Sequence, residues 1–303
     1  MASVSSLDEA AGALASAHAD GRRVRIGDDL TADGLDRVLE HDPGDLTCTV
    51  EAGVRLSELR AVLAAAGQRL SLDPPGDPTV GALLARNVSG PLRHRFGAPR
   101  DLVLGATLVL ADGTIASAGG KVVKNVAGYD LARLVCGSEG RLAFIARASF
   151  RLHPLPKASR TLVVETTDAA AAVTALMRSQ LQPSAVDVLH AGRVAVLFEG
   201  SVRAVAAQLD SARVLVGGAE ADAAVWDESR HRQGAAPGRV RFDPGELRPV
   251  LEALSDAVIR PAAGVAYTAE NASYNLLQAP SDGAVERLVQ RIAHELDPRG
   301  VLS

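Results

Sequence analysis

The chain has 303 residues, of which 22% are charged and 47% are hydrophobic, and its formal net charge is −4 at pH 7. This length is sufficient for two domains of ordinary size, each with its own core. Because there is no basic excess, we expect no nucleic acid as a partner. Aromatic residues, at 3%, are also too few for the stacking surfaces of proteins that bind single strands.

The two cysteines, Cys48 and Cys136, fit neither a metal-ligand spacing nor a disulfide framework. We interpret both as small buried thiols and expect no metal site. The first 23 residues include Asp8 and Glu9 and lack the apolar core of a signal peptide. No apolar run reaches the roughly 20 residues of a membrane span. A cytoplasmic protein without a membrane-spanning segment is therefore expected.

Helical and extended patterns alternate in the first half of the chain. Ser6 and Glu9 form an S-x-x-E capping box, which predicts a helix that ends at Gly21. A strand is expected over 22–26, and a second, rich in Thr and Val, over 46–51. Further expected elements are a helix over 56–66, a short helix over 80–86, a hairpin around Asp112-Gly113 and a strand over 143–152.

Two prolines in the segment HPLPK, residues 153–157, indicate a linker, so we expect one domain over 1–157 and another over 158–303. The order of patterns after the linker resembles a βαββαβ ferredoxin-like unit. The expected elements are a strand over 160–167, a helix over 168–181, strands over 185–190 and 194–199, a helix over 201–211, a strand over 213–217, a helix over 245–256, a strand pair within 264–277 and a helix over 282–296.

Three segments have the character of phosphate-binding loops. A pyrophosphate needs converging backbone N–H groups and no crowding side chains, which Gly-rich turns and helix N-termini provide. The segments are PPGDPTVG at 74–81, NVSG at 87–90 and GSEG at 137–140. Each alone is a weak signal, because a GSEG turn is most often a hairpin turn or a helix cap.

The order of these segments is more specific. PPGDPTVGALLARNVSG, GAPRDLVLGATLVLADG and GGKVVKNVAGYDLARLVCGSEGRLAFI together resemble the FAD-binding domain of the vanillyl-alcohol-oxidase or PCMH type, and within it the FAD-binding subunits of glycolate oxidases. The resemblance covers about residues 5–157, and KNVAGYDL at 124–131 is its most specific part. It implies an α+β fold: a two-lobed PCMH-type FAD-binding domain followed by a ferredoxin-like cap domain. The chain contains no G-x-G-x-x-G motif.

The resemblance also implies FAD as a noncovalent cofactor, because no His stands in a covalent-flavin context. The resemblance places Pro75 and Gly76 along the phosphate path, and Thr79, Val80 and Gly81 at the pyrophosphate, with the N–H groups of Val80 and Gly81 on it. It places Asn87, Ser89 and Gly90 near the isoalloxazine or ribityl chain, with Asp101 supporting their loop. Gly137, Glu139 and Gly140 would close over the cofactor.

The sequence departs from the family pattern at two places. Arg141 and Ala143 follow the GSEG turn, where the family often has Thr and Gly. The first Gly-rich loop of the family is replaced by a short segment with Gly27, Asp28 and Asp29. Carboxylates at that position would repel a phosphate and weaken FAD binding. Alternatively, the acids point outward or cap a helix over 32–39.

Several other side chains have two readings each. The basic trio at 93–95 either anchors a carboxylate or phosphate, or is a solvated loop. The hydroxyl of Tyr129, after Lys121 and Lys124, either faces the flavin or is half-buried in the core. Two further groups are Trp226 and Arg230, expected to anchor the second domain, and Tyr267, Tyr274 and Asn275, which either line a pocket or pack within strands.

The reaction implied by the resemblance is dehydrogenation of a small 2-hydroxy acid, with the redox chemistry carried by the flavin. The sequence identifies no catalytic base. The resemblance implies two partners, a larger flavin subunit and an iron–sulfur subunit, and this chain has no Cys cluster for an iron–sulfur centre. We therefore expect little activity from the isolated chain. The alternative is a degenerate homologue that has lost flavin and acts as a non-catalytic scaffold.

Overall fold

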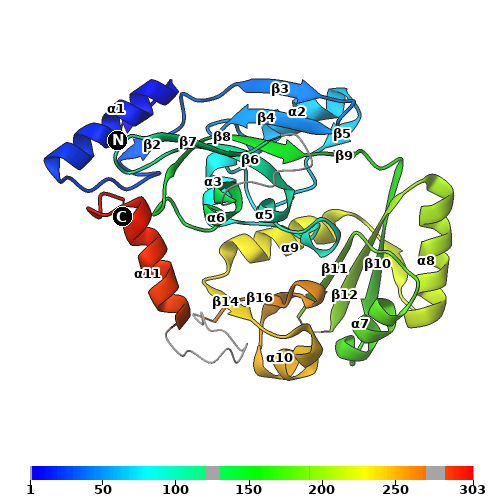
Figure 1. The fold of residues 1–303 in the computed structure, drawn as a ribbon. Coiled ribbons are helices and arrows are strands. Elements are labelled where there is room, and N and C mark those ends of the chain that lie inside the picture. The colour runs from blue at the N-terminus through cyan, green and yellow to red at the C-terminus, as the bar shows by residue number, and fades with distance from the viewer. Residues whose placement is uncertain (1, 121–129, 191, 271–283, 303) are drawn as a thin grey trace.

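The computed structural model describes residues 2–120, 130–190, 192–270 and 284–302 (Figure 1). Two antiparallel sheets organise these residues, one in each half of the chain. The first sheet has the strand order β3-β4-β8-β6-β7. Its strands are β3 (Val38–Asp42), β4 (Thr47–Glu51), β6 (Val103–Val109), β7 (Ile115–Gly119) and β8 (Phe144–Arg151).

Short helices cover one face of the first sheet. The apolar sides of α2 (Leu56–Ala65), α3 (Val80–Arg86) and α6 (Leu131–Leu134) share one core with Val50, Ala106 and other inward residues of the strands. The turns around this core hold α4 (Arg93–Phe96) and α5 (Pro99–Leu102), and β5 (Gln68–Arg69) pairs with β9 (His153–Pro154). The helices at 56–66 and 80–86 and the strands at 46–51 and 143–152 are thus confirmed.

A second core lies beside this sheet, under α1 (Leu7–Asp20). Ser6 caps α1 by accepting a hydrogen bond from the Glu9 N–H, as its capping box predicts. In the same lobe β1 (Ala2–Ser3) pairs in parallel with β2 (Leu30–Thr31). The expected strand over 22–26 is wrong, because Val24 and Ile26 each form only an isolated bridge.

The helix considered over 32–39 is also wrong. The carbonyls of Ala32 and Leu35 face Gly53, where a Cβ would lie 2.1 Å from the Ala32 oxygen, and the Gly53 N–H donates to the Leu35 carbonyl at 2.8 Å. This close backbone packing leaves no room for a helical turn, and the chain continues extended into β3. Cys48 is buried and Cys136 partly so, and burial raises the pKa of each thiol to about 12.

The second sheet has the strand order β13-β10-β12-β11-β15-β16-β14. The first four strands of this half in chain order are β10, β11, β12 and β13, and they lie in the sheet in the order β13-β10-β12-β11. Neighbours among them are antiparallel, which is the ferredoxin-like arrangement expected from the sequence. The elements are β10 (Ala158–Glu165), α7 (Ala169–Arg178), β11 (Ala185–Leu189), β12 (Arg193–Gly200), α8 (Val202–Val216) and β13 (Ala219–Ala221).

The strand expected over 213–217 is wrong. Leu209 and Ala212 are buried at helical spacing, so α8 continues to Val216 and ends at Gly217, whose φ is +72°. The fourth strand, β13, follows this glycine. Three strands that extend the sheet are β14 (Gly238–Arg241), β15 (Ala257–Arg260) and β16 (Val265–Thr268), of which only β16 falls in the expected strand pair; residues 271–277 lie outside the described part of the chain.

Helix α9 (Ala224–Ala235) lies between the two sheets, and α10 (Leu247–Ala253) covers the second one (Figure 1). Single 3₁₀ turns occur at Pro244–Glu246 and Pro261–Ala263. We call the part of the chain built on the first sheet the first unit and the part built on the second sheet the second unit. Helix α11 (Ala284–Leu296) leads back to the first unit, where Val301 and Leu302 join the core under α1. The division at residue 157 stays a prediction, since the chain changes sheets there but returns at its C-terminal residues.

Candidate functional site

Helix α3 forms the centre of the candidate site. Its N-cap is Thr79, whose hydroxyl accepts a hydrogen bond from the Ala82 N–H at 3.3 Å. Asn87, with φ +49°, ends the helix in the left-handed conformation that Asn tolerates. Val80, Leu83 and Leu84 are buried against the first sheet, so the opposite side of the helix is free to line a cavity.

The GSEG turn is hydrogen-bonded to the end of α3. The Gly137 N–H donates to the Leu84 carbonyl at 3.0 Å, and the Glu139 N–H donates to the Ala85 carbonyl at 2.8 Å. Gly140 has φ +81°, and a Cβ at this position would lie 2.8 Å from the Cβ of Ile26. Glycine is therefore required where the turn meets the first loop.

A cleft of about 670 Å³ opens between these segments. Its walls are the turn at 25–33, one side of α3, and residues 139–145. Among the predicted cofactor-binding residues, the cleft brings together Thr79, Gly81, Glu139 and Gly140. Sequence segments more than 50 residues apart, each weak as a signal, thus meet at one site.

The other predicted residues lie elsewhere. Pro75 and Gly76 line a second cavity, of about 890 Å³, between the first unit and α9. The remaining residues line neither of these two cavities, and they are Val80, Asn87, Ser89, Gly90, Asp101 and Gly137. Asp101 supports its loop as expected, because its carboxylate accepts the Ala98 N–H at 2.8 Å.

The predicted pyrophosphate donors are already engaged. The Val80 N–H donates to the Val54 carbonyl at 2.9 Å, and the Gly81 N–H donates to the Ala52 carbonyl at 2.7 Å. A Cβ on Gly81 would lie 3.0 Å from the Ala52 Cβ, so this glycine permits close packing on β4 and its following turn. Donation from these two N–H groups to a phosphate is therefore not the role that this backbone gives them.

The first loop, at 25–30, is a tight turn stabilised by its own acids. The N–H groups of Asp28 and Asp29 both donate to the Arg25 carbonyl, at 3.2 and 2.8 Å. The Asp29 carboxylate accepts the Arg25 N–H at 2.9 Å, and Asp28 forms an exposed ion pair with the Arg25 guanidinium at 3.4 Å. Gly27, with φ +97°, donates to Leu30. The acids thus close a turn and cap no helix.

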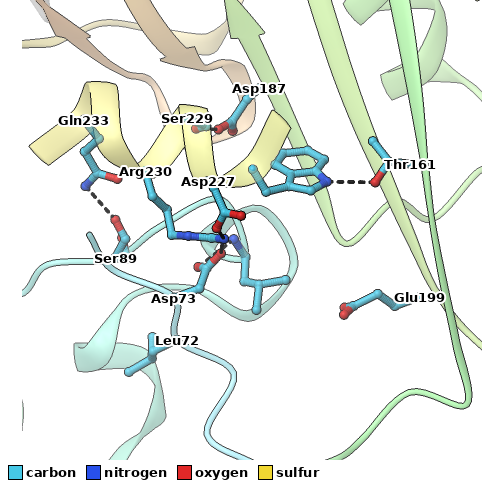
Figure 2. Close-up of polar contacts among 12 residues, drawn as sticks. Leu72, Asp73, Ser89, Thr161, Asp187, Glu199, Asp227, Ser229, Arg230 and Gln233 are labelled. Carbon is cyan, nitrogen blue, oxygen red and sulfur yellow. Dashed lines mark hydrogen bonds and ion pairs between the residues drawn. The ribbon is translucent and has the colours of Figure 1, made fainter. Parts of the chain in front are cut away.

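A buried polar network connects the first unit to α9 (Figure 2). Asp73 accepts the Leu92 N–H at 3.0 Å and lies 3.4 Å from the Arg230 guanidinium. Burial raises the pKa of Asp73 to about 7, although Arg260 and Arg230 act in the opposite direction. Gln233 donates to the Ser89 carbonyl at 2.9 Å. Two loops of the first unit are therefore held by one helix of the second.

Gly90 packs its backbone directly against Asp73 of this network. A Cβ on Gly90 would lie 1.7 Å from the Asp73 carbonyl oxygen, so this glycine approaches protein backbone and not, as expected, the cofactor. Trp226 donates to the Thr161 hydroxyl at 2.9 Å and packs on the second sheet, while Arg230 reaches Asp73. The expectation that these two side chains anchor the second unit is confirmed.

Arg239 and Arg241 of β14 lie on the same face of the second sheet as Tyr267 of β16, and we call these two residues, together with Arg93 of α4, the arginine cluster. Arg93 donates to the Ser89 hydroxyl at 3.3 Å, and Arg239 is the direct strand partner of Tyr267. Burial lowers the pKa of Arg93, and the charges of Arg239 and Arg241 lower it further, while Tyr267 and Asp101 raise it. No carboxylate of the described residues lies within 4 Å of these guanidinium groups.

The rest of the basic trio faces elsewhere. His94 and Arg95 border a small cavity beside α7, and burial lowers the pKa of His94. The other residues with two readings, Lys121, Lys124, Tyr129, Tyr274 and Asn275, lie outside the described residues. Within the described ranges, no group of three or more His, Cys, Asp or Glu side chains is placed to hold a metal ion, and none of the described helices is long and apolar enough to cross a membrane.

Comparison with known proteins decides the family. A family described as FAD binding domain matches residues 4–119. Glycolate oxidase subunit GlcE of Escherichia coli K12 is 30% identical over 298 residues, which cover 88% of this chain and 83% of that protein. The chain belongs to this family of FAD-binding oxidoreductases. The expected cofactor, FAD, and the expected enzyme class are thereby confirmed.

Two further comparisons agree with this FAD-binding family. Glycolate oxidase subunit GlcD of Bacillus subtilis is 38% identical over 165 residues, which cover 51% of this chain but only 34% of that protein. A solved structure of alkyldihydroxyacetonephosphate synthase superposes with a TM-score of 0.72, covering 99% of this chain and 74% of that one at 15% identity. At that identity the likeness concerns the fold alone, and it confirms the expected α+β class.

The residues of the cleft fit the chemical demands of FAD. Its phosphates need cations or N–H donors, and the cleft offers the guanidinium groups of Arg25, Arg86 and Arg141. A flat ring needs apolar walls, which Ile26 and Ile145 help to provide. The first turn, whose N–H groups are engaged internally, contributes charge and shape to this site rather than backbone donors.

Proposed function

We propose that this oxidoreductase is the small FAD-binding subunit of a glycolate oxidase-like complex that dehydrogenates small 2-hydroxy acids. Its partners in this proposal are a larger flavin subunit and an iron–sulfur subunit, and its location is the cytoplasm. Relatives named as glycolate oxidase subunits support the assignment, and D-lactate dehydrogenases of yeast and Arabidopsis thaliana also match about half of the chain.

The arginine cluster is the observation that carries the substrate class. A 2-hydroxy acid is a small carboxylate, and guanidinium groups bind carboxylates through charge-assisted, often bidentate hydrogen bonds. Arg93 comes from the first unit, whereas Arg239 and Arg241 come from β14 of the second. A substrate held here would contact both units, next to Tyr267. When bound, FAD accepts the two electrons that leave the substrate's carbon–oxygen centre.

Four of the twelve predicted residues remain cofactor-lining residues in this proposal. Thr79, Gly81, Glu139 and Gly140 line the cleft, where the dinucleotide portion would lie. Residues 158–303 would act as the cap domain. We propose noncovalent attachment, because the sequence places no His in a covalent-flavin context.

A scaffold without flavin is the second candidate, and the first turn favours it, because its N–H groups are engaged and the Asp28 carboxylate stands beside the cleft. A visible spectrum of the purified protein separates the candidates. Flavin bands, followed by release of all flavin into the supernatant after acid precipitation, are the expected result. A colourless protein that stays colourless after incubation with FAD favours the scaffold, and a yellow pellet contradicts noncovalent binding.

Turnover tests the subunit assignment. We expect the isolated chain, loaded with FAD, to oxidise glycolate or D-lactate slowly or not at all with an artificial acceptor. Addition of the larger flavin subunit and the iron–sulfur subunit should raise the rate. Brisk turnover by the isolated chain would overturn the subunit proposal.

A further inference from the structure

Arg260 is the largest fully buried side chain of the described residues, with 2% of its surface exposed. It stands at the end of β15, within the apolar segment AVIRP and directly before a 3₁₀ turn. Guanidinium groups are almost never buried to this degree unless they are paired and hydrogen-bonded. Its partners therefore indicate what the buried charge is for.

The contacts of Arg260 reach from the second sheet to the first unit. Its Nη1 donates to the Ser89 carbonyl at 3.3 Å, and its Nη2 donates to the Gln233 Oε1 at 2.8 Å. Its Nε lies 3.4 Å from the buried Asp187 carboxylate. Gln233 donates to the same Ser89 carbonyl at 2.9 Å. Two donors of the second unit, linked to each other, thus converge on one backbone oxygen.

Ser89 passes this constraint on to the arginine cluster. Its hydroxyl accepts from the Arg93 Nη1 at 3.3 Å, four residues further along the same loop. Asp73 also fixes this loop, because the Leu92 N–H donates to its carboxylate and Gly90 packs on its carbonyl. The Arg260 guanidinium itself lies over the Tyr267 ring, 5.1 Å from its centroid. Arg260 therefore contacts both Ser89, which binds Arg93, and Tyr267, the strand partner of Arg239.

We propose that Arg260 is a positioning residue, which holds the Ser89–Arg93 loop so that the Arg93 guanidinium faces the substrate carboxylate. The inference rests on the proposed function of the arginine cluster. A planar guanidinium suits this role, because its donors are fixed in one fork and its charge cannot be lost by deprotonation. Residues that bind substrate lose affinity when the groups supporting them are loose by about 1 Å.

Arg260 could be needed only to hold the two units together. A second arginine, Arg69, joins the same two units and serves as the control for this simpler role. Arg69 of β5 forms a bidentate ion pair with Glu199 of β12, with both distances 2.7 Å and with side-chain exposures of 16% and 9%. This pair also joins the two units, and no hydrogen bond or ion pair of the described residues links it to Ser89 or Arg93; the Arg69 guanidinium lies over the Phe96 ring at the far end of α4, 5.2 Å from its centroid. Arg69→Gln therefore removes an adhesive contact and keeps the hydrogen bonds of Ser89 and Arg93.

The experiment measures binding of oxalate, a small dicarboxylate probe, to the full-length chain by isothermal titration calorimetry. We expect Arg260→Gln to weaken oxalate binding by about tenfold or more, a loss typical of misplaced binding groups. Arg260→Lys, which keeps the charge, should recover part of the affinity, and Arg69→Gln should stay within about twofold of the wild type. Emission of Trp226, the single Trp of the chain, reports whether α9 stays docked in each variant.

The outcomes separate this inference from the proposed function. If Arg93→Gln binds oxalate as tightly as the wild type, the arginine cluster is not the carboxylate site and the proposed function loses its support. If Arg93→Gln weakens binding but Arg260→Gln does not, only the positioning role is wrong. Equal losses in Arg260→Gln and Arg69→Gln would show adhesion alone.

A gentler variant guards against misfolding of Arg260→Gln. Gln233→Ala removes one of the two donors to the Ser89 carbonyl without leaving a carboxylate unpaired. We expect it to weaken oxalate binding about threefold while Trp226 emission stays that of the wild type. Unchanged affinity in this variant would contradict the convergence on Ser89 as the source of positioning.

Discussion

The cleft beside α3 and the interface between the first unit and α9 differ in the exposure of their charged side chains. In the cleft, Arg25 pairs with Asp28 and Arg141 with Glu139, and all four side chains are at least 60% exposed. At the interface, Asp73, Asp187 and Arg260 are buried, and Asp73 is fixed by the Leu92 N–H and the Arg230 guanidinium. The same residue types thus form loose pairs in one place and a fixed network in the other.

The difference bears on what each region does for function. Exposed ion pairs are worth little and rearrange easily, so an anionic cofactor can take over the arginines of the cleft. Buried networks are costly to break and define one geometry. We therefore expect substitutions at the interface to change stability strongly and those at the cleft to change ligand affinity mildly.

The largest expected effect concerns Gly90. In Gly90→Ala the new Cβ would lie 1.7 Å from the Asp73 carbonyl oxygen, which forces the two loops apart. We expect the free energy of unfolding to fall by on the order of 4–5 kcal/mol, as in severe overpacking. Urea titration followed by Trp226 emission measures the loss.

Gly76→Ala is the control for Gly90. Gly76 has φ +70°, but a Cβ there meets no atom within 4 Å. The change should lower the free energy of unfolding by about 1 kcal/mol, from the left-handed backbone alone. Similar losses in the two variants would contradict the close approach of Gly90 to Asp73.

The next effect is the pH dependence that Asp73 gives the interface. Its pKa of about 7 in the folded state lies above the unfolded value, so the folded protein retains a proton that the unfolded chain releases. Stability from this group is therefore greatest at low pH and is lost as pH rises from about 4 to 7, by on the order of 3 kcal/mol.

Asp73→Asn tests this dependence, because Asn keeps an acceptor for the Leu92 N–H but does not titrate. As pH rises from about 4 to 7, the unfolding free energy of the wild type should fall relative to that of Asp73→Asn. Parallel pH curves for the two proteins would show that Arg230 and Arg260 keep Asp73 ionised throughout.

Much of the fold was predictable from local patterns. The Ser6 capping box, the helical spacing of Leu56, Leu59 and Leu63, and the Thr- and Val-rich segment of β4 each define an element that the structure contains. The end of α8 was not predictable in this way, because Arg213–Val216 has the composition of a strand. The helix continues because Val216 follows Leu209 and Ala212 on the face that packs on the second sheet, while Val214 and Leu215 are exposed.

The site was predictable only as a set of segments. Gly-rich composition marked the turn at 137–140, but not that Gly81 and Gly90 serve backbone packing, which depends on Ala52 and Asp73 arriving from elsewhere in the fold. The buried network left one signal that sequence reasoning missed. Asp187 and Arg260 interrupt the apolar strands AVDVL and AVIR with opposite charges, which indicates a buried pair.

The smallest effect is expected in the cleft, from Asp28→Asn. Asp28 stands beside the cleft with its side chain 65% exposed, so its repulsion of a phosphate is screened by water and salt. Removing its charge also frees Arg25 from its ion pair. We expect FAD to bind about two- to threefold more tightly at low salt, and equally tightly at high salt, consistent with the small free energies of exposed charges.

Asp29→Asn provides the contrast that makes this result informative. The Asp29 carboxylate accepts the Arg25 N–H and closes the turn, so its replacement should loosen the wall of the cleft and leave FAD affinity unchanged or weaker. Titration of apo-protein with FAD at two salt concentrations measures both variants. If the two variants tighten binding equally at low salt, charge alone controls this loop and its hydrogen bonds are incidental. If neither responds to salt, both acids lie away from the phosphates, and the short first loop does not act on FAD by electrostatic repulsion.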